Sequence, residues 1–176
     1  MSISIPRPAA DEYTQWYAGY IDETSDITDL VTHLARQGDQ TRKLFTALSD
    51  EQANFRYAPG KWSVKDIVLH LSDAERVFSY RMLSFARNDP QPLPGFSETD
   101  WAAAAGAEVR GMAGLAAELF AARSSTVALL QGLGEDTFAR RGTANENLFT
   151  VRAVAWIIAG HELHHLRIVR ERYLTS

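Results

Sequence analysis

Apolar residues recur every three or four positions along four stretches of this chain, which is the period of an amphipathic helix. Ser63 and Asp66 form an S-x-x-D start that is typical of a helix N-terminus. The prolines of NDPQPLPG prevent that helix from continuing, and Gly106 and Gly111 indicate a break inside the third stretch. The pattern therefore predicts four helical regions, at residues 26–48, 63–88, 98–132 and 150–174.

No stretch of the chain alternates between apolar and polar residues as a strand should. The polar stretch ARRGTANENLF predicts a loop or a short ribbon, and a long connection separates the second helix from the third. We therefore predict an all-α fold: an antiparallel four-helix bundle with one long crossover connection, formed as a single domain by residues 1–176. Residues 1–22, which are rich in aromatic side chains, are expected to cover one end of this bundle.

Composition narrows the classes of function. The chain has 176 residues, a formal net charge of −4 and no run of lysine or arginine, so we expect neither a nucleic-acid partner nor a membrane surface. No apolar stretch approaches the length of a membrane span on inspection, and a cytoplasmic location is expected. The absence of cysteine excludes disulfides, thiolate metal ligands and a cysteine nucleophile.

The motif HELHH at residues 161–165 matches the H-E-x-x-H signature of zinc proteases. On a helical wheel of about 100° per residue, His161 and His165 lie about 40° apart in the middle of the apolar face. His164 lies on one flank, and Glu162 lies on the other, where we favour an ion pair. Burying two unpaired imidazoles would cost free energy, whereas a metal accepts both from one turn of helix. Metal binding and simple core packing are both open at this point.

A metal site needs a third ligand. A zinc protease takes its third ligand from downstream of the motif, but no histidine follows His165, so the protease interpretation is disfavoured. His33 lies about 100° from the centre of the first apolar stripe and is expected at the surface or its boundary. His70 lies at the edge of the second apolar stripe. We therefore predict a metal site on His70, His161 and His165, with one ligand from one helix and two from a facing helix.

Two stretches around these histidines, RYAPGKWSVKDIVLHLSDAERVFSYR and VRAVAWIIAGHELHHLRIVRERY, resemble the DinB/YfiT-like family of helical-bundle metalloproteins. LPGFSETDW and DEYTQWYAGYI do so too, and the resemblance covers almost the whole chain. The resemblance implies a four-helix bundle that holds one divalent metal on three histidines, which map onto His70, His161 and His165. Zinc or nickel is the expected metal, with manganese and iron as alternatives. Characterised members of the family transfer small thiols such as bacillithiol or use mycothiol in an isomerisation.

Three functions are compatible with these observations. The first is metal-dependent transfer of a low-molecular-weight thiol to an electrophile, which the resemblance favours and which requires a thiol from outside because the chain has no cysteine. The second is a metal-dependent hydrolase that activates water. The third is a metal-binding stress-response protein without catalysis. Three protein ligands leave a coordination position open, which argues against a purely structural metal.

Several other residues are candidates for supporting roles. Asp66 and Asp73 lie about one turn on either side of His70, and either could orient the imidazole by accepting its second N–H. The alternatives are a helix start for Asp66 and a solvated acid for Asp73. The extra histidine of the pattern, His164, is expected to support the site or the fold. The candidates for substrate binding, which could equally serve ion pairing or packing, are Arg81, Tyr17 and Trp101.

The last helix also carries apolar residues opposite its core face. Trp156, Leu163 and Leu174 lie at about 200–220° on the wheel, and arginines accompany them. An apolar ridge with arginines on an outer face is typical of an interface. This ridge predicts a homodimer.

Overall fold

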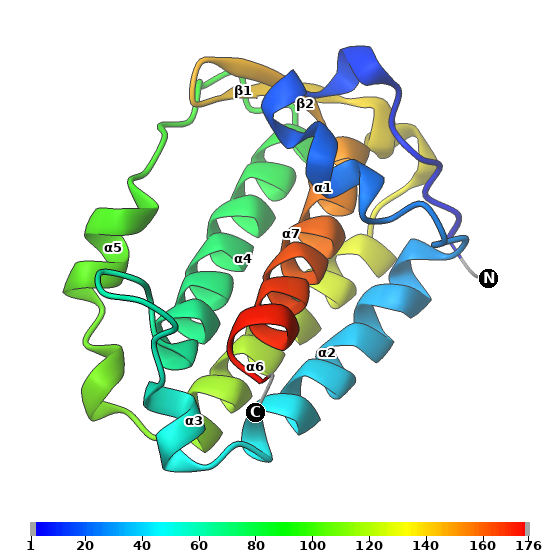
Figure 1. Ribbon diagram of the computed structural model, residues 1–176. Coiled ribbons are helices and arrows are strands. Elements are labelled where there is room, and N and C mark those ends of the chain that lie inside the picture. Colours follow the sequence, from blue (N-terminus) through cyan, green and yellow to red (C-terminus); the bar gives the residue numbers. More distant parts are fainter. Residues whose placement is uncertain (1–2, 175–176) are drawn as a thin grey trace.

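The computed structural model describes residues 3–174, which form a bundle around four long helices (Figure 1). These helices are α2 (Leu30–Thr46), α4 (Val64–Ala86), α6 (Met112–Gln131) and α7 (Val151–Arg172). Helix α6 packs against α2 and α4, and α7 packs against α4. Helices α4 and α6 run in one direction and α2 and α7 in the other (Figure 1). The predicted all-α bundle with one long crossover is confirmed, because the chain must return along the bundle between the parallel helices α4 and α6.

Short elements fill the connections. The crossover contains α5 (Glu98–Ala104) and a 3-10 turn (Ala107–Val109), and Gly106 between them has a left-handed φ of +66°, so the predicted break in the third region is real. The first long helix begins at Leu30 rather than at residue 26, because Asp29 accepts a hydrogen bond from the Thr32 N–H and caps it there. The remaining short helices are Ala10–Glu12, Gln15–Tyr17, α1 (Ala18–Asp22), α3 (Asp50–Asn54) and Glu135–Ala139.

The stretch predicted as a loop or short ribbon is a two-stranded antiparallel hairpin of β1 (Arg141–Ala144) and β2 (Asn147–Thr150). Asn145 and Glu146 form its turn with positive φ values of 48° and 62°. Leu93 of the crossover bonds to the hairpin through its N–H and its carbonyl, each at 2.9 Å. The hairpin therefore ties the crossover to the end of the bundle where α7 begins.

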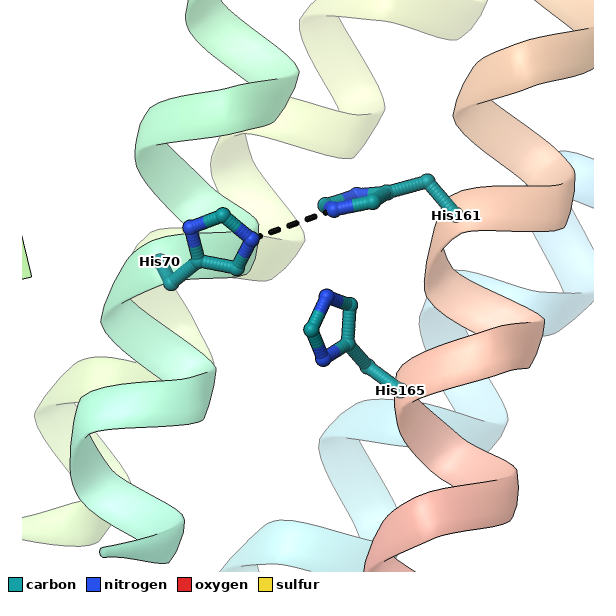
Figure 2. A group of neighbouring side chains, drawn as sticks. All are labelled: His70, His161 and His165. Atoms are coloured by element: carbon teal, nitrogen blue, oxygen red, sulfur yellow. Dashed lines mark hydrogen bonds between the residues drawn. The ribbon is translucent and has the colours of Figure 1, made fainter. Parts of the chain in front are cut away.

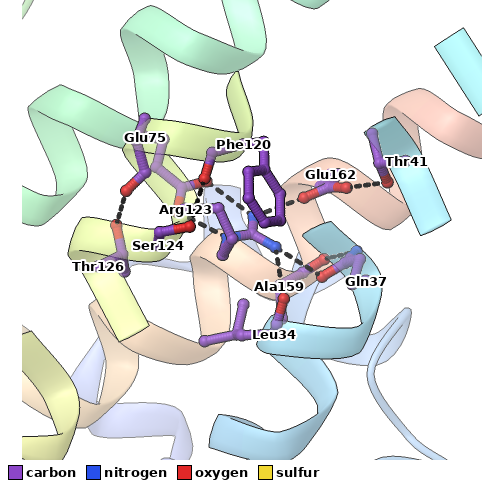
Figure 3. A network of polar contacts seen from close by, with 11 residues as sticks. Leu34, Gln37, Thr41, Glu75, Phe120, Arg123, Ser124, Thr126, Ala159 and Glu162 are labelled. Atoms are coloured by element: carbon purple, nitrogen blue, oxygen red, sulfur yellow. Dashed lines mark hydrogen bonds and ion pairs between the residues drawn. The ribbon is translucent and has the colours of Figure 1, made fainter. Parts of the chain in front are cut away.

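The apolar core is divided into two clusters along the bundle axis. One contains Leu34, Phe78 and Ile157, and the other contains Phe45, Val68 and Leu166. Polar side chains occupy the level between them. At this level α4 and α7 face one another through His70, His161 and His165 (Figure 2). A buried network of charged side chains lies where α4 and α7 meet α2 and α6 (Figure 3).

The buried network, which we call the Arg123 layer, joins all four long helices through one guanidinium. Arg123 on α6 is only 2% exposed and donates to both carboxylate oxygens of Glu75 on α4 at 2.7 Å (Figure 3). It also pairs with Glu162 on α7 and donates to the Gln37 side chain on α2 at 3.2 Å. The Thr41 hydroxyl donates to the other oxygen of Glu162. Burial lowers the pKa of Arg123, but the two carboxylates outweigh burial and raise it, so the guanidinium stays charged.

Helix α6 is long and apolar enough to cross a membrane by length and composition, contrary to the expectation that no stretch would be. In the structure it packs against α2 and α4. Its middle carries Arg123, which is fully engaged in buried ion pairs. The apolar composition of α6 is therefore that of a helix packed inside a bundle, which is consistent with a non-membrane protein.

The N-terminal segment covers part of α7 that was predicted to be exposed. The Trp156 indole N–H donates to the Pro6 carbonyl at 3.1 Å, and the Arg7 guanidinium lies 5.4 Å from the indole centroid. Trp156 is only 2% exposed, so its assignment to an outer ridge with Leu163 and Leu174 is wrong. The wheel angle was correct, but a segment distant in sequence occupies that face. A homodimer stays a prediction, and Trp156 is not available to its interface.

Helix α1 crosses α7 at Gly160. A Cβ atom at this position would lie 1.8 Å from the backbone carbonyl oxygen of Tyr20. We expect Gly160→Ala to lower the free energy of unfolding by about 1–3 kcal/mol, because a methyl group there must displace backbone. Urea denaturation followed by circular dichroism measures this. The matched control is Gly114→Ala in α6, where a Cβ meets nothing within 4 Å and no loss is expected. Equal stability of Gly160→Ala and the wild type would contradict the close approach.

The Arg123 layer makes a second prediction. Arg123→Met should lower the free energy of unfolding by about 3–5 kcal/mol, because it leaves two buried carboxylates without their cation. Arg76→Met is the control, since Arg76 is half-exposed and its ion pairs with Asp73 and Glu118 lie at the surface. The control should lose no more than about 1 kcal/mol. Equal losses in the two variants, measured by denaturation, would show that the layer is not a stabilising element.

Candidate metal centre

Two facing helices position the three histidines. His161 and His165 are four residues apart on α7, so they project from the same face one turn apart. His70 projects from α4 toward them, and Figure 2 shows the three rings converging between the helices. The start of α4 is fixed by a capping box, in which Ser63 accepts from the Asp66 N–H and Asp66 accepts from the Ser63 N–H. Local helix signals and bundle packing together bring the predicted set into one place.

The ring nitrogens are close enough to share one ion. One nitrogen from each of the three imidazoles lies within 4.8 Å of the others, and the Nε2 atoms of His70 and His161 are 3.1 Å apart. A tetrahedral zinc ion with Zn–N bonds of about 2.05 Å places its ligand nitrogens about 3.3 Å apart. The observed spacing is therefore compatible with a single metal ion after small ring movements.

Burial keeps these imidazoles neutral. It lowers the pKa of His70 to about 4, although Glu98 opposes the shift, and it lowers that of His165 to about 3, with further lowering from His70 and His164. Burial also lowers the pKa of His161 well below its ordinary value, and the neighbouring histidines add to this. Neutral imidazole is the form that binds a metal, so the site is ready to accept a cation near pH 7.

The acids predicted to orient His70 do not contact it. Asp66 accepts from Ser63 and pairs with Arg56 at 2.8 Å, while Asp73 pairs with Arg76 at 3.3 Å. Their proposed role beside His70 is therefore wrong for this structure, since both side chains are committed to the start and the surface of α4. Besides the two other histidines, His70 contacts Trp62, whose ring centroid lies 4.9 Å away.

The other two polar members of HELHH, Glu162 and His164, lie outside the cluster. The prediction of an ion pair for Glu162 is confirmed, because its carboxylate binds Arg123 on the far side of α7. His164 is half-buried at the rim, where it contacts the Tyr20 ring at 5.3 Å and lies 3.4 Å from Arg167. The motif therefore supplies two candidate ligands and no carboxylate to the centre.

The three histidines form the floor of a pocket of about 450 Å³. Two predicted substrate-binding residues, Tyr17 and Arg81, line it, but Trp101 does not. The Trp101 ring lies 4.7 Å from that of Phe96, and Trp101 lines a neighbouring apolar groove of about 370 Å³. The two pockets share Arg81 and Phe96 as lining residues, and a substrate-binding role for Trp101 stays a prediction.

Several lining residues were not predicted from the sequence. Phe78 lines the pocket with its ring 5.8 Å from that of His161, and its place on the apolar stripe of α4 gave no hint of this role. Glu98 lines the opening from the first turn of α5. The hairpin contributes Asn145 and Asn147, which a sequence pattern cannot place because the position of the hairpin depends on its contacts with the crossover and with α4.

Comparison with known proteins places the fold in a family. Residues 33–169, most of the chain, match the sequence profile of the DinB superfamily. The solved structure of YfiT from Bacillus subtilis, described as a probable metal-dependent hydrolase with an unusual four-helix bundle topology, superposes with a TM-score of 0.59. The two sequences are 18% identical, and the match covers 94% of this chain and 93% of YfiT.

Two bacterial relatives are provisionally named metal-dependent hydrolases. The protein from Geobacillus kaustophilus is 28% identical over 149 residues, which cover 81% of this chain and 82% of that protein. The protein from Geobacillus thermodenitrificans is 30% identical over 82 residues, and there the match spans 47% of this chain and 46% of the relative. With a profile match that spans the bundle and the three-histidine centre, this chain belongs to the DinB superfamily.

Proposed function

We propose that this protein is a metal-dependent enzyme that binds one divalent ion on His70, His161 and His165 and delivers a small cellular thiol to an electrophile held in the pocket. The observation that carries the proposal is the convergence of three neutral imidazoles on the floor of a pocket of about 450 Å³. Among residues 3–174, no fourth histidine or carboxylate joins the cluster. A coordination position directed at the pocket is therefore left to an external ligand.

An all-imidazole donor set suits zinc or nickel, with iron and manganese as alternatives. A divalent ion held there would supply Lewis acidity, lowering the pKa of a thiol or a water that reaches the open position. The protein's own contribution is placement. The rings of Trp62, Phe78 and Tyr20 pack around the imidazoles and exclude bulk water from their sides.

The position of Glu162 favours a thiol over water as the nucleophile. In H-E-x-x-H proteases the glutamate is the general base that takes a proton from water. Here Glu162 is only 2% exposed and is bound by Arg123 and Thr41, so it cannot reach the pocket. An ordinary thiol has a pKa of about 8.5, so it needs far less assistance to ionise than water does. A site without an adjacent carboxylate base therefore suits the thiol better.

Hydrolysis is the second candidate function. It is favoured by the provisional names of the Geobacillus relatives and by the description of YfiT. The chemistry would use the same centre with water in place of the thiol. Glu98 is the one carboxylate of the described residues that lines the pocket; it is exposed, and its charge opposes the lowering of the His70 pKa.

The metal proposal predicts one equivalent of divalent metal per chain. His70→Ala, His161→Ala and His165→Ala should each reduce bound metal at least about tenfold in elemental analysis, because each removes one of three ligands. Added zinc should raise the unfolding temperature of the wild type, since a ligand that binds only the folded state stabilises it. This rise should disappear in the three variants.

Two other histidines supply matched controls for the metal measurement. His33→Ala removes a half-buried imidazole from α2, away from the cluster, and His164→Ala removes one from the rim. Both variants should keep a full equivalent of metal. Full retention of metal in His70→Ala would show that the ligand from α4 is misassigned.

The catalytic proposal predicts metal-dependent conjugation of a thiol. The zinc- or nickel-loaded protein is mixed with bacillithiol, mycothiol, glutathione or coenzyme A and the electrophile monochlorobimane. Bimane fluorescence should rise faster than the uncatalysed rate with at least one thiol. The rate should fall to background in His161→Ala and after chelation, and it should persist in His33→Ala.

A parallel assay with p-nitrophenyl acetate separates the two candidate functions. Metal-dependent release of nitrophenol without acceleration of any thiol reaction would reject the thiol proposal and support the hydrolase. If metal is bound but neither reaction is accelerated, both enzyme proposals fail while the metal site stands.

A further inference from the structure

Arg81 is a buried cation without a carboxylate partner. Its side chain, on the last turns of α4, is only 3% exposed, and it lines the pocket that contains the three histidines. Its Nη2 donates to the Pro94 carbonyl at 3.0 Å, but its buried Nε has no hydrogen-bond partner among residues 3–174. None of the ion pairs among residues 3–174 involves Arg81. A buried charge in this state lacks the compensation that such groups ordinarily have.

The other fully buried arginine shows the contrast. Arg123 is also in the interior, but it donates to two carboxylates, Glu75 and Glu162, and to two further oxygens. Arg123 needs no ligand to complete its bonding. Arg81 retains a donor and its positive charge, and it lies at a pocket rather than in closed core.

Arg81 lies within reach of the histidine cluster. The Phe78 ring bridges the two, with its centroid 5.8 Å from the Arg81 Cζ and 5.8 Å from the His161 ring. Because this one aromatic ring lies beside both groups, a ligand that packs on it lies between Arg81 and the histidine cluster. Tyr17 lies beside them, with its ring 6.2 Å from that of Phe78. Burial raises the pKa of the Tyr17 hydroxyl, while the charge of Arg81 and a hydrogen bond from its side chain oppose this rise.

We propose that Arg81 binds the carboxylate of a small substrate whose apolar body packs against Phe78 and Tyr17 and whose reacting end lies at the three histidines. This inference rests on the proposed function for the reacting end, whereas the carboxylate site itself requires only Arg81 and the pocket. A carboxylate supplies both the negative charge and the acceptor atoms that the guanidinium lacks. Glu98, the acid at the opening, is exposed and forms no ion pair with Arg81, so it leaves the position free for a ligand.

The test compares an acid with its amide. The full chain, as purified and again with chelator, is titrated with 3-phenylpropanoate and with 3-phenylpropanamide, and 15N chemical shifts report the two dissociation constants. Wild type should bind the carboxylate at least about tenfold more tightly, because a hydrogen bond to a charged group is stronger than one to a neutral group. Arg81→Gln should reduce this preference to near unity. Arg87→Gln is the matched control, since it removes an exposed arginine from the end of the same helix and should keep the preference.

A readout in the wild type guards against a variant that does not fold. The Arg81 Nε–H resonance should shift when the carboxylate is added and stay in place when the amide is added. Lack of a preference in the wild type, its retention in Arg81→Gln, or an unmoved Nε–H resonance would each overturn the proposal. The repeat with chelator tests the carboxylate site without metal. An Arg81-dependent preference in that arm supports this inference even if the proposed metal-dependent function fails.

Discussion

A single buried guanidinium sets the orientation of the helices on which the metal centre depends. Arg123 is surrounded by all four long helices, and each carboxylate that it binds comes from a different one. Charges in a low-dielectric interior must be matched closely, so this pairing tolerates little rotation of α7 about its axis. Glu162 and His161 are adjacent, and adjacent residues point about 100° apart on a helix. With Glu162 turned to Arg123, His161 and His165 must face α4, where His70 lies.

The same constraint explains why H-E-x-x-H does not produce a protease site here. The two histidines and the glutamate of this motif project in different directions from one helix, and only the surrounding fold decides which direction leads to a pocket. In this bundle the glutamate points into closed core and the histidines point to a cavity. The motif therefore provides candidate metal ligands without a base. A sequence pattern of this length specifies a helix face but not the chemistry of the adjacent space.

The features that could be predicted are those that depend on periodicity within one element. The four helical regions, the break at Gly106 and the shared face of His161 and His165 all follow from the 3.6-residue repeat and from glycine and proline signals. The choice of His70 followed from its stripe and was reinforced by the family resemblance. These assignments hold because helix propensity and bundle packing favour the same arrangement.

The features that could not be predicted depend on pairings across the chain. Arg123 lies in AARSST, which suggests an exposed helix face, and its carboxylate partners are 48 and 39 residues away. Gly38 is part of the same hidden arrangement, since a Cβ there would lie 2.9 Å from the Arg123 Cγ. Trp156 was placed on the correct side of its helix, but the covering Pro6 is 150 residues away. Where a residue's environment is supplied by another element, its angle on a wheel does not determine its burial.

The distribution of charge along α4 connects the stability of this fold with its chemistry. Three side chains along this helix differ in charge. His70 is a neutral candidate ligand, Glu75 is a carboxylate paired with Arg123, and Arg81 is a cation without a carboxylate partner. The matched pair stabilises the bundle, whereas an uncompensated buried charge costs several kcal/mol. Methionine or leucine would fill the position of Arg81 at lower cost if packing were its only role. A divalent ion at the histidines would add a second positive charge to that of Arg81. Both ends of the pocket would then favour anionic groups. This distribution of charge favours a negatively charged ligand whatever the reaction.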